Sequence, residues 1–202
     1  MLKLILLFSM LLSTGLASAN PRIVVIGDSL TAGHGVSLEH SFPSVLQKIL
    51  RSSGYPKAVV VNAGTTGATT AFGLSTLEFQ LKQGTPIDLL VYALGSNDAL
   101  RGLDVKATKA NIDKVLEAAQ AKKLKIVLAG LLAPPNYGKD YSEKFQAIFP
   151  ELASKHKIPL IKFLLDGVAG NPALNLPDGI HPNDKGYQVV AKNVFETVKK
   201  SL

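Results

Sequence analysis

The stretch Arg22-Ile23-Val24-Val25-Ile26-Gly27-Asp28-Ser29-Leu30 decides the fold of this chain. After Arg22 it is apolar and β-branched over four residues, which is typical of a parallel strand buried on both faces. Gly27-Asp28-Ser29-Leu30 follows directly, so the pattern predicts a serine at the carboxyl end of the first strand. In an open α/β sheet, that edge is where ligands bind.

The rest of the chain alternates short apolar runs with longer amphipathic segments. The expected strands span residues 23–26, 59–61, 89–93, 126–129 and 160–163. The expected helices span residues 42–51, 71–82, 105–122, 141–155 and 184–199. Right-handed crossovers between such βα units give a three-layer α/β/α sandwich of the flavodoxin-like type, with a central five-stranded parallel sheet.

Each expected strand is followed by a polar or glycine-rich segment. These segments are 27–35, 62–70, 95–98, 130–138 and, after a longer stretch, 178–183. Since the carboxyl ends of parallel strands share one edge of the sheet, the topology brings all of them to the same place.

A base for Ser29 is available near the far end of the chain. A serine hydroxyl is a weak nucleophile until a base lies within hydrogen-bond reach. Asp178-Gly179-Ile180-His181 places a carboxylate and an imidazole three residues apart, so that one turn can hold the ring between Asp178 and Ser29. The pattern predicts Ser29 as nucleophile, His181 as base and Asp178 as the residue that orients the base.

Each of these residues also has an ordinary structural interpretation. Ser29 could be an N-cap or a turn residue, His181 a solvated loop histidine, and Asp178 a capping residue. The combination of the three in this order favours catalysis.

Acyl transfer also needs donors for the oxyanion. The segment 62–70 contains glycines that let a backbone N–H approach a substrate closely, and Asn97 in Gly95-Ser96-Asn97-Asp98 offers an amide NH2. Both segments could equally be simple strand-to-helix turns, with Asn97 stabilising its own turn.

Several classes of protein are disfavoured. The Gly-x-Ser-x-Gly elbow of the α/β-hydrolases is absent around Ser29. The chain has no cysteine, and its histidines, at positions 34, 40, 156 and 181, lack paired metal-ligand spacing. We therefore expect no metal.

His34 is close to Ser29 in sequence, and we interpret it as a loop residue that could touch the substrate.

The first nineteen residues have the pattern of a signal peptide. Lys3 precedes the apolar run 4–12, and Ala17-Ser18-Ala19 is an A-x-A cleavage sequence before Asn20. The expected mature protein is a single domain over residues 20–202, periplasmic or secreted, with no transmembrane or lipoprotein anchor.

The formal net charge of +7 does not indicate a nucleic-acid partner. The lysines are scattered, without a basic run or the interleaved aromatic residues of a stacking platform. The surplus either favours transient contact with anionic lipid surfaces or is an ordinary solvated surface.

These motifs together resemble those of the SGNH hydrolases, the GDSL-type esterases and lipases. Gly27-Asp28-Ser29-Leu30, Gly67, Gly95-Ser96-Asn97-Asp98 and Asp178-Gly179-Ile180-His181 match the four family blocks in order. Within the family, the chain is most similar to the bacterial periplasmic group of thioesterase I, lysophospholipase and arylesterase enzymes.

The resemblance implies an oxyanion hole formed by the N–H of Ser29, the N–H of Gly67 and the side chain of Asn97. It also implies a monomeric enzyme without a cofactor. The sequence departs from the family at Ala68, where many relatives have an acidic residue, and this departure affects the expected stiffness of the loop.

We expect small acyl-ester or thioester substrates, including acyl-CoA, aryl esters and lysophospholipids. The apolar loop after the fourth strand offers a wall for an acyl chain, with the substrate-binding candidates Leu132, Pro134, Pro135, Asn136 and Tyr137. Two alternatives remain at this stage, a carbohydrate acetylesterase with the same four blocks and a non-catalytic flavodoxin-like module that binds an anion.

Overall fold

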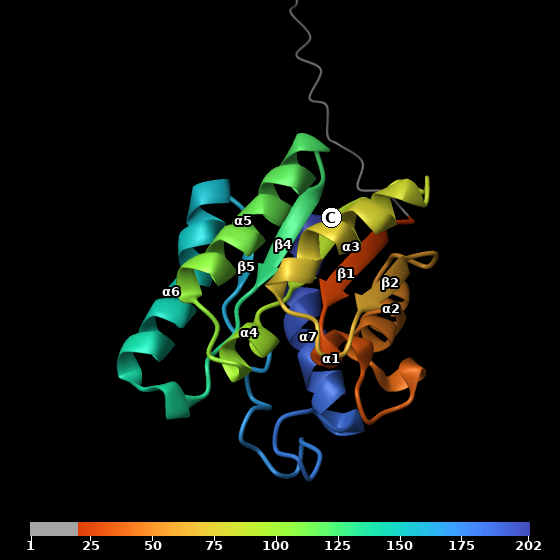
Figure 1. Ribbon diagram of the computed structural model, residues 1–202. Helices are drawn as coiled ribbons and strands as arrows, with labels where there is room; N and C mark the ends of the chain where they lie inside the picture. Colours follow the sequence, from red (N-terminus) through yellow and green to blue (C-terminus); the bar gives the residue numbers. More distant parts are fainter. Residues whose placement is uncertain (1–19) are drawn as a thin grey trace, which may run out of the picture.

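The computed structural model describes residues 20–202, and the proposed signal peptide lies outside these residues. The described chain has the predicted five-stranded parallel sheet, with the strand order β2-β1-β3-β4-β5 (Figure 1). The strands are β1 (Arg22–Gly27), β2 (Val59–Gly64), β3 (Leu89–Ala93), β4 (Lys125–Ala129) and β5 (Leu160–Ile161). This order is that of the flavodoxin-like folds.

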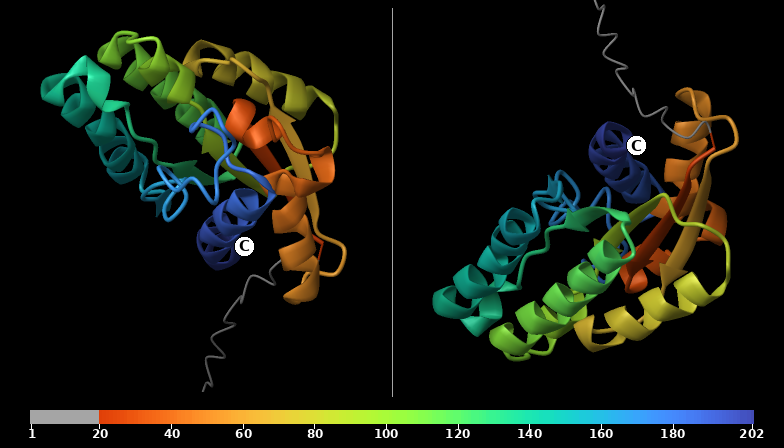
Figure 2. Two further views of the ribbon diagram at one scale, coloured as in Figure 1. Left: turned by 90° about the horizontal axis from the view of Figure 1, so that it is seen from below. Right: turned by 90° about the horizontal axis from the view of Figure 1, so that it is seen from above.

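Helices cover both faces of the sheet, as Figure 2 shows from below and from above. One face carries α2 (Phe42–Ser52) and α7 (Asp184–Ser201), which pack against each other. The other carries α3 (Gly73–Lys82), α5 (Val105–Ala121) and α6 (Lys139–His156). The three layers of the predicted sandwich are therefore present.

The central strands supply the core. Every residue of β3 is buried, and Ile23 through Ile26 of β1 are fully inaccessible to solvent. Such strands are apolar on both faces because helices lie above and below them. In α7 the buried positions Tyr187, Val190 and Val194 recur at three- and four-residue spacing and face the sheet.

Two short helices were not expected from the sequence. They are α1 (Ser29–Ala32) and α4 (Ser96–Leu100), which follow β1 and β3 directly. A helix of four or five residues is too short to show a hydrophobic period, so only its cap can reveal it. For α1 that cap is Asp28, whose Oδ1 accepts a hydrogen bond of 2.9 Å from the N–H of Leu30.

The fifth strand is shorter than predicted, since β5 ends at Ile161 rather than at residue 163. Beyond it the N–H of Leu164 bonds to the carbonyl of Gly130, so the chain turns toward the end of β4 and leaves the sheet. Apolar residues continue past the turn because Leu164 and Val168 are buried in the same core.

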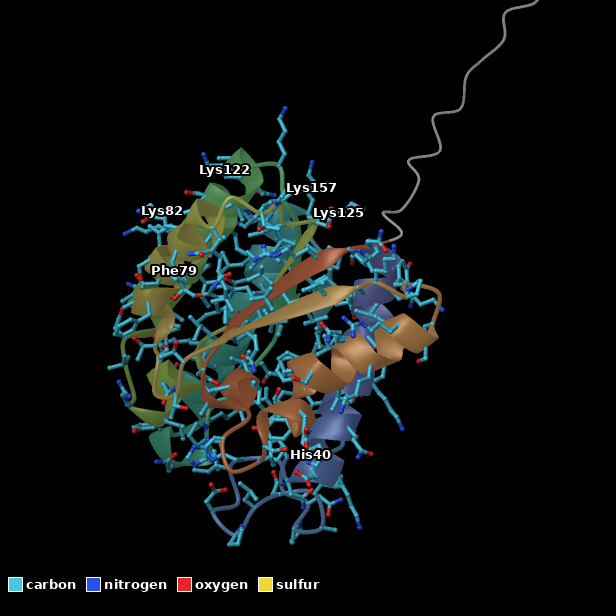
Figure 3. All side chains as sticks on the ribbon, turned by 90° about the vertical axis from the view of Figure 1, so that its right-hand side faces the viewer. His40, Phe79, Lys82, Lys122, Lys125 and Lys157 are labelled. Atoms are coloured by element: carbon cyan, nitrogen blue, oxygen red, sulfur yellow. The ribbon has the colours of Figure 1, made fainter. Side chains whose placement is uncertain are left out.

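The basic surplus is partly explained by the helix ends. Lys82, Lys122 and Lys157 lie at the carboxyl ends of α3, α5 and α6, where a cation interacts favourably with the helix dipole. Figure 3 shows them with Lys125 at the end of the molecule opposite to His40.

Among residues 20–202, no helix has the length and apolar character needed to cross a bilayer.

A close backbone contact fixes α1 against the sheet. Gly64 ends β2 beside Gly27, and a Cβ atom on it would lie 2.4 Å from the backbone N of Ala32. Because backbone cannot move aside cheaply, we expect Gly64→Ala to lower the free energy of unfolding by roughly 1–3 kcal/mol. Urea unfolding measures this, with Val59→Ala in the exposed start of the same strand as the control. Equal stability of the two variants would contradict the proposed contact.

Candidate active site

Ser29 is held at the point where β1 ends and α1 begins. It is the first residue of α1, its side chain is half-buried, and α1 ends at Gly33 in the left-handed conformation, with φ of 85°. The serine thus lies at the carboxyl edge of the sheet, as the sequence predicts.

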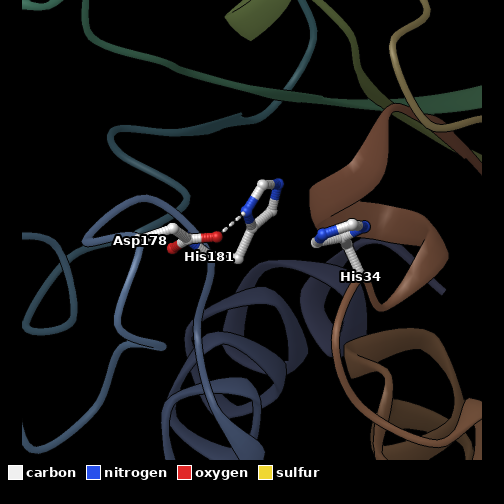
Figure 4. Close-up of side chains that lie close together, drawn as sticks. All are labelled: His34, Asp178 and His181. Carbon is white, nitrogen blue, oxygen red and sulfur yellow. Dashed lines mark hydrogen bonds and ion pairs between the residues drawn. The ribbon is translucent and has the colours of Figure 1, made fainter.

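The structure brings His181 and Asp178 to Ser29. His181 Nε2 lies 2.9 Å from Ser29 Oγ, and His181 Nδ1 lies 2.7 Å from Asp178 Oδ2. Figure 4 shows the carboxylate and the imidazole pointing toward each other. An imidazole between a carboxylate and a serine hydroxyl is the arrangement in which serine can lose its proton to a base.

The turn around Asp178 keeps this carboxyl charged. Its Oδ1 accepts hydrogen bonds from the backbone N–H groups of His181, at 3.0 Å, and Ile180, at 2.9 Å. The hydrogen bonds from the His181 backbone and ring, with that from Ile180, lower the pKa of Asp178 to about 2. Asp178 therefore presents an anion to the Nδ1–H side of the ring at neutral pH.

Asp28 is in the opposite electrostatic situation, although it is the immediate neighbour of Ser29. Its side chain is fully buried. Burial raises the pKa of Asp28 to about 6, and the hydrogen bond from Leu30 N–H offsets only part of that effect. Sequence reasoning gave Asp28 no role beyond its place in the motif.

The two glycine-rich segments are cross-linked. Asn97 Nδ2 donates to the carbonyl of Ala68 at 3.0 Å, and Arg101 Nη2 donates to the carbonyl of Gly67 at 2.9 Å. Gly67 has φ of 79°, which a residue with a Cβ adopts only under strain. An amide NH2 has two hydrogens, so the bond to Ala68 leaves one available for a second acceptor.

Asp98 is a structural residue of this site that the sequence did not reveal. It is almost fully buried and accepts hydrogen bonds from the N–H of Thr70, at 2.8 Å, and from its hydroxyl, at 2.6 Å. Asp98 thereby holds the end of the segment 62–70 against α4. The available sequence signal is the place of Asp98 in the motif Gly95-Ser96-Asn97-Asp98, but the motif does not identify its partner.

A cavity of about 530 Å³ opens beside Ser29. Its lining is mainly apolar and comes from α1, α4, the segment after β4 and the segment after β5. The lining residues are Ser29, Leu30, Ser96, Asn97, Leu100, Leu131, Leu132, Ala133, Pro134, Pro135, Phe163, Leu165, Ala169, Gly179 and Ile180.

Three of the five substrate-binding candidates, Leu132, Pro134 and Pro135, line this cavity, whereas Asn136 and Tyr137 are not among the lining residues. The hydroxyl of Tyr137 instead donates to the carbonyl of Leu100 at 2.9 Å, and the Tyr137 side chain is exposed to solvent. Phe163, Leu165 and Ala169 of the segment after β5 were missed because they are far from every motif in sequence.

His34 lies against His181. The ring centroids of His34 and His181 are 4.4 Å apart, and the ring planes are inclined by 42° (Figure 4). The two histidines have no metal-ligand spacing in sequence, and only the fold makes them neighbours.

Comparison with known proteins agrees with this geometry. The sequence profile of the GDSL-like Lipase/Acylhydrolase family matches residues 25–189. An arylesterase of Vibrio mimicus is 35% identical over 202 residues, covering 100% of this chain and 98% of its own. Thioesterase 1/protease 1/lysophospholipase L1 of Escherichia coli K12 is 36% identical, covering 90% of this chain and 85% of its own.

The crystal structure of TesA superimposes with a TM-score of 0.84 at 36% identity, covering 90% of this chain and 99% of that chain. The fold with its site at the carboxyl edge of the sheet is thus that of an SGNH hydrolase. The chain belongs to the GDSL-like lipase/acylhydrolase family and is a carboxylic ester hydrolase.

Because Asp28 is buried, we expect the free energy of unfolding to depend on pH. Its pKa is raised in the folded protein, so the fold loses stability as pH rises from about 4 through about 6. Asp28→Asn cannot ionise but keeps an acceptor for Leu30 N–H. We expect the stability of the variant relative to the wild type to rise by about 2 kcal/mol between pH 4.5 and pH 8.

Urea unfolding at both pH values measures this difference. Glu78→Gln, which removes an exposed carboxylate from α3, is the matched control. If the difference between Asp28→Asn and the wild type is the same at both pH values, Asp28 does not ionise with a raised pKa.

Proposed function

We propose that this protein is a serine esterase that cleaves carboxylic esters and thioesters through an acyl-enzyme on Ser29. The observation that carries the proposal is the position of the His181 ring, with Nε2 at 2.9 Å from Ser29 Oγ and Nδ1 at 2.7 Å from Asp178.

In the proposed reaction, Ser29 Oγ attacks the acyl carbonyl carbon while His181 Nε2 takes the hydroxyl proton. The charge of Asp178 stabilises the imidazolium that forms. When the tetrahedral intermediate collapses, His181 returns the proton to the leaving alcohol or thiol. Water then attacks the acyl-enzyme with His181 again as base, which releases the carboxylic acid and restores Ser29.

The oxyanion would be held by the N–H of Ser29, the N–H of Gly67 and the second amide hydrogen of Asn97. The positive φ of Gly67 and the hydrogen bond from Asn97 to Ala68 support this assignment, because both orient the donors before substrate arrives.

The cavity supports an acyl chain as the preferred group. An acetyl group would fill a small part of 530 Å³, and a sugar would find few polar partners beyond Ser29, Ser96 and Asn97 in a lining rich in leucine and proline. This argues against a carbohydrate acetylesterase. A non-catalytic binding module leaves the His181 contacts unexplained.

The names of the relatives suggest aryl esters, acyl-thioesters and lysophospholipids as substrates. We further propose that the enzyme is an exported monomer that works without a cofactor, and the signal-like pattern of residues 1–19 supports the export. We also propose that any contact of the basic surface with anionic lipid is transient.

Replacing the nucleophile tests the function. The wild type is expected to hydrolyse p-nitrophenyl esters, faster for medium acyl chains than for acetate, and a phosphonate ester should label Ser29. Ser29→Ala should lose at least about a thousandfold in kcat. Ser96→Ala, which removes another hydroxyl of the same cavity, is the matched control and should still accept the label. Label on a different serine, or activity retained in Ser29→Ala, would refute the mechanism.

Asn97 allows a separate test of the oxyanion hole. If its amide donates in the transition state, Asn97→Ala should lower kcat and kcat/KM together by about a hundredfold, with little change in KM. Asn111→Ala is the control, because Asn111 Nδ2 bonds to Thr70 Oγ1 on the same segment without lining the cavity. A loss below about threefold, measured on active-site-titrated protein, would make Asn97 a loop stabiliser only.

A further inference from the structure

His34 lies next to His181, the proposed base, but the proposed reaction gives His34 no role. One possible ligand atom from each of His34, Asp178 and His181 lies within 4.8 Å of the others. Over residues 20–202, these form the one group of three or more histidine, cysteine or acidic residues that meet so closely.

The other two histidines are already engaged. His40 Nδ1 lies 3.0 Å from Asp184 Oδ2. His156 is buried, and its two ring nitrogens bond to Gln120 and Asp113. His34, by contrast, is exposed to solvent next to His181.

Backbone contacts hold the loops of His34 and His181 side by side. The N–H of His34 donates to the carbonyl of Ser29 at 3.1 Å. Gly35, the next residue, has φ of 78°, and a Cβ atom on it would lie 2.3 Å from Leu176 Cδ1. The N–H of Leu176 in turn donates to the carbonyl of His181 at 2.8 Å. The loop that carries His34 therefore packs directly on the loop that carries His181.

Two imidazoles and a carboxylate are a typical ligand set for Zn²⁺, with water in the fourth position. Tetrahedral bonds of about 2.0–2.1 Å place ligand atoms about 3.3 Å apart. The three ligand atoms would thus have to close by at most about 1.5 Å, and rotation of the exposed His34 side chain supplies such a movement. Mg²⁺ and Ca²⁺ prefer oxygen ligands and would not select this group.

We propose that His34, His181 and Asp178 form an inhibitory Zn²⁺ site. Both nitrogens of His181 already hold a partner, Ser29 at Nε2 and Asp178 at Nδ1. Whichever nitrogen coordinates the metal, the Ser29–His181–Asp178 array loses one of its two hydrogen bonds, and the ring can no longer accept a proton from serine. The inhibition, though not the binding, rests on the proposed function.

Binding is measured first without reference to activity. Isothermal titration of tag-free Ser29→Ala protein with ZnCl₂ should show one site, and the double variant Ser29→Ala/His34→Ala should bind at least about tenfold more weakly. Ser29→Ala/His40→Ala is the matched control and should bind as tightly as Ser29→Ala. Equal affinity with and without His34, or no binding at 1 mM Zn²⁺, would overturn the site.

Inhibition is then measured on enzyme with Ser29 intact, each variant relative to its own zinc-free rate. Zn²⁺ should inhibit the wild type and His40→Ala equally, EDTA should restore the rate, and His34→Ala should need at least about tenfold more Zn²⁺. A wild type that binds Zn²⁺ through His34 yet keeps its full rate would overturn the inhibitory role. A wild type without hydrolytic activity would contradict the proposed function, while the titration would still decide the metal site.

Discussion

The hydrogen bond between His181 Nε2 and Ser29 Oγ joins residues 152 positions apart in the chain, and the candidate site depends on it. It requires that the start of α7 lie beside α1. Packing of α7 on α2 and on the sheet through Tyr187, Val190 and Val194 provides that placement. The hydroxyl of Tyr187 also lies 3.5 Å from the carbonyl oxygen of Ser29. The short hydrogen bond between Ser29 and His181 thus depends on the packing of a large apolar interface.

Two carboxyl groups near Ser29 have opposite environments. Asp178 is stabilised as an anion by hydrogen bonds at a surface turn, whereas Asp28 is buried and favours its neutral form. Groups whose surroundings move their pKa values apart are common at functional sites. The cap that Asp28 provides for α1 fixes the backbone of Ser29, so the free-energy cost of burying this carboxyl is tied to the position of Ser29, the proposed nucleophile.

Sequence reasoning located the strands and their common edge because buried parallel strands leave a strong apolar signal. It also placed Ser29, Asp178 and His181 on loops that the topology brings together. It missed α1 and α4, which are too short for periodicity, and it extended β5 over Lys162 and Phe163, which lie outside the sheet. Contacts such as His34 with His181 depend on how two loops pack, which no local pattern encodes.

The segment 62–70 illustrates how stiffness can arise without a particular side chain. Only 5% of the surface of Ala68 is exposed to solvent. A carboxylate at this position would have to lose its hydration, or it would displace the loop. Stiffness comes instead from the hydrogen bonds that Asn97, Asp98 and Arg101 make to this segment. Because all three residues lie in or next to α4, a shift of this short helix would move Gly67 and Asn97 together. The Gly67 N–H and the Asn97 amide, which we propose as oxyanion donors, are therefore held as one unit whose internal spacing a shift of α4 would leave unchanged.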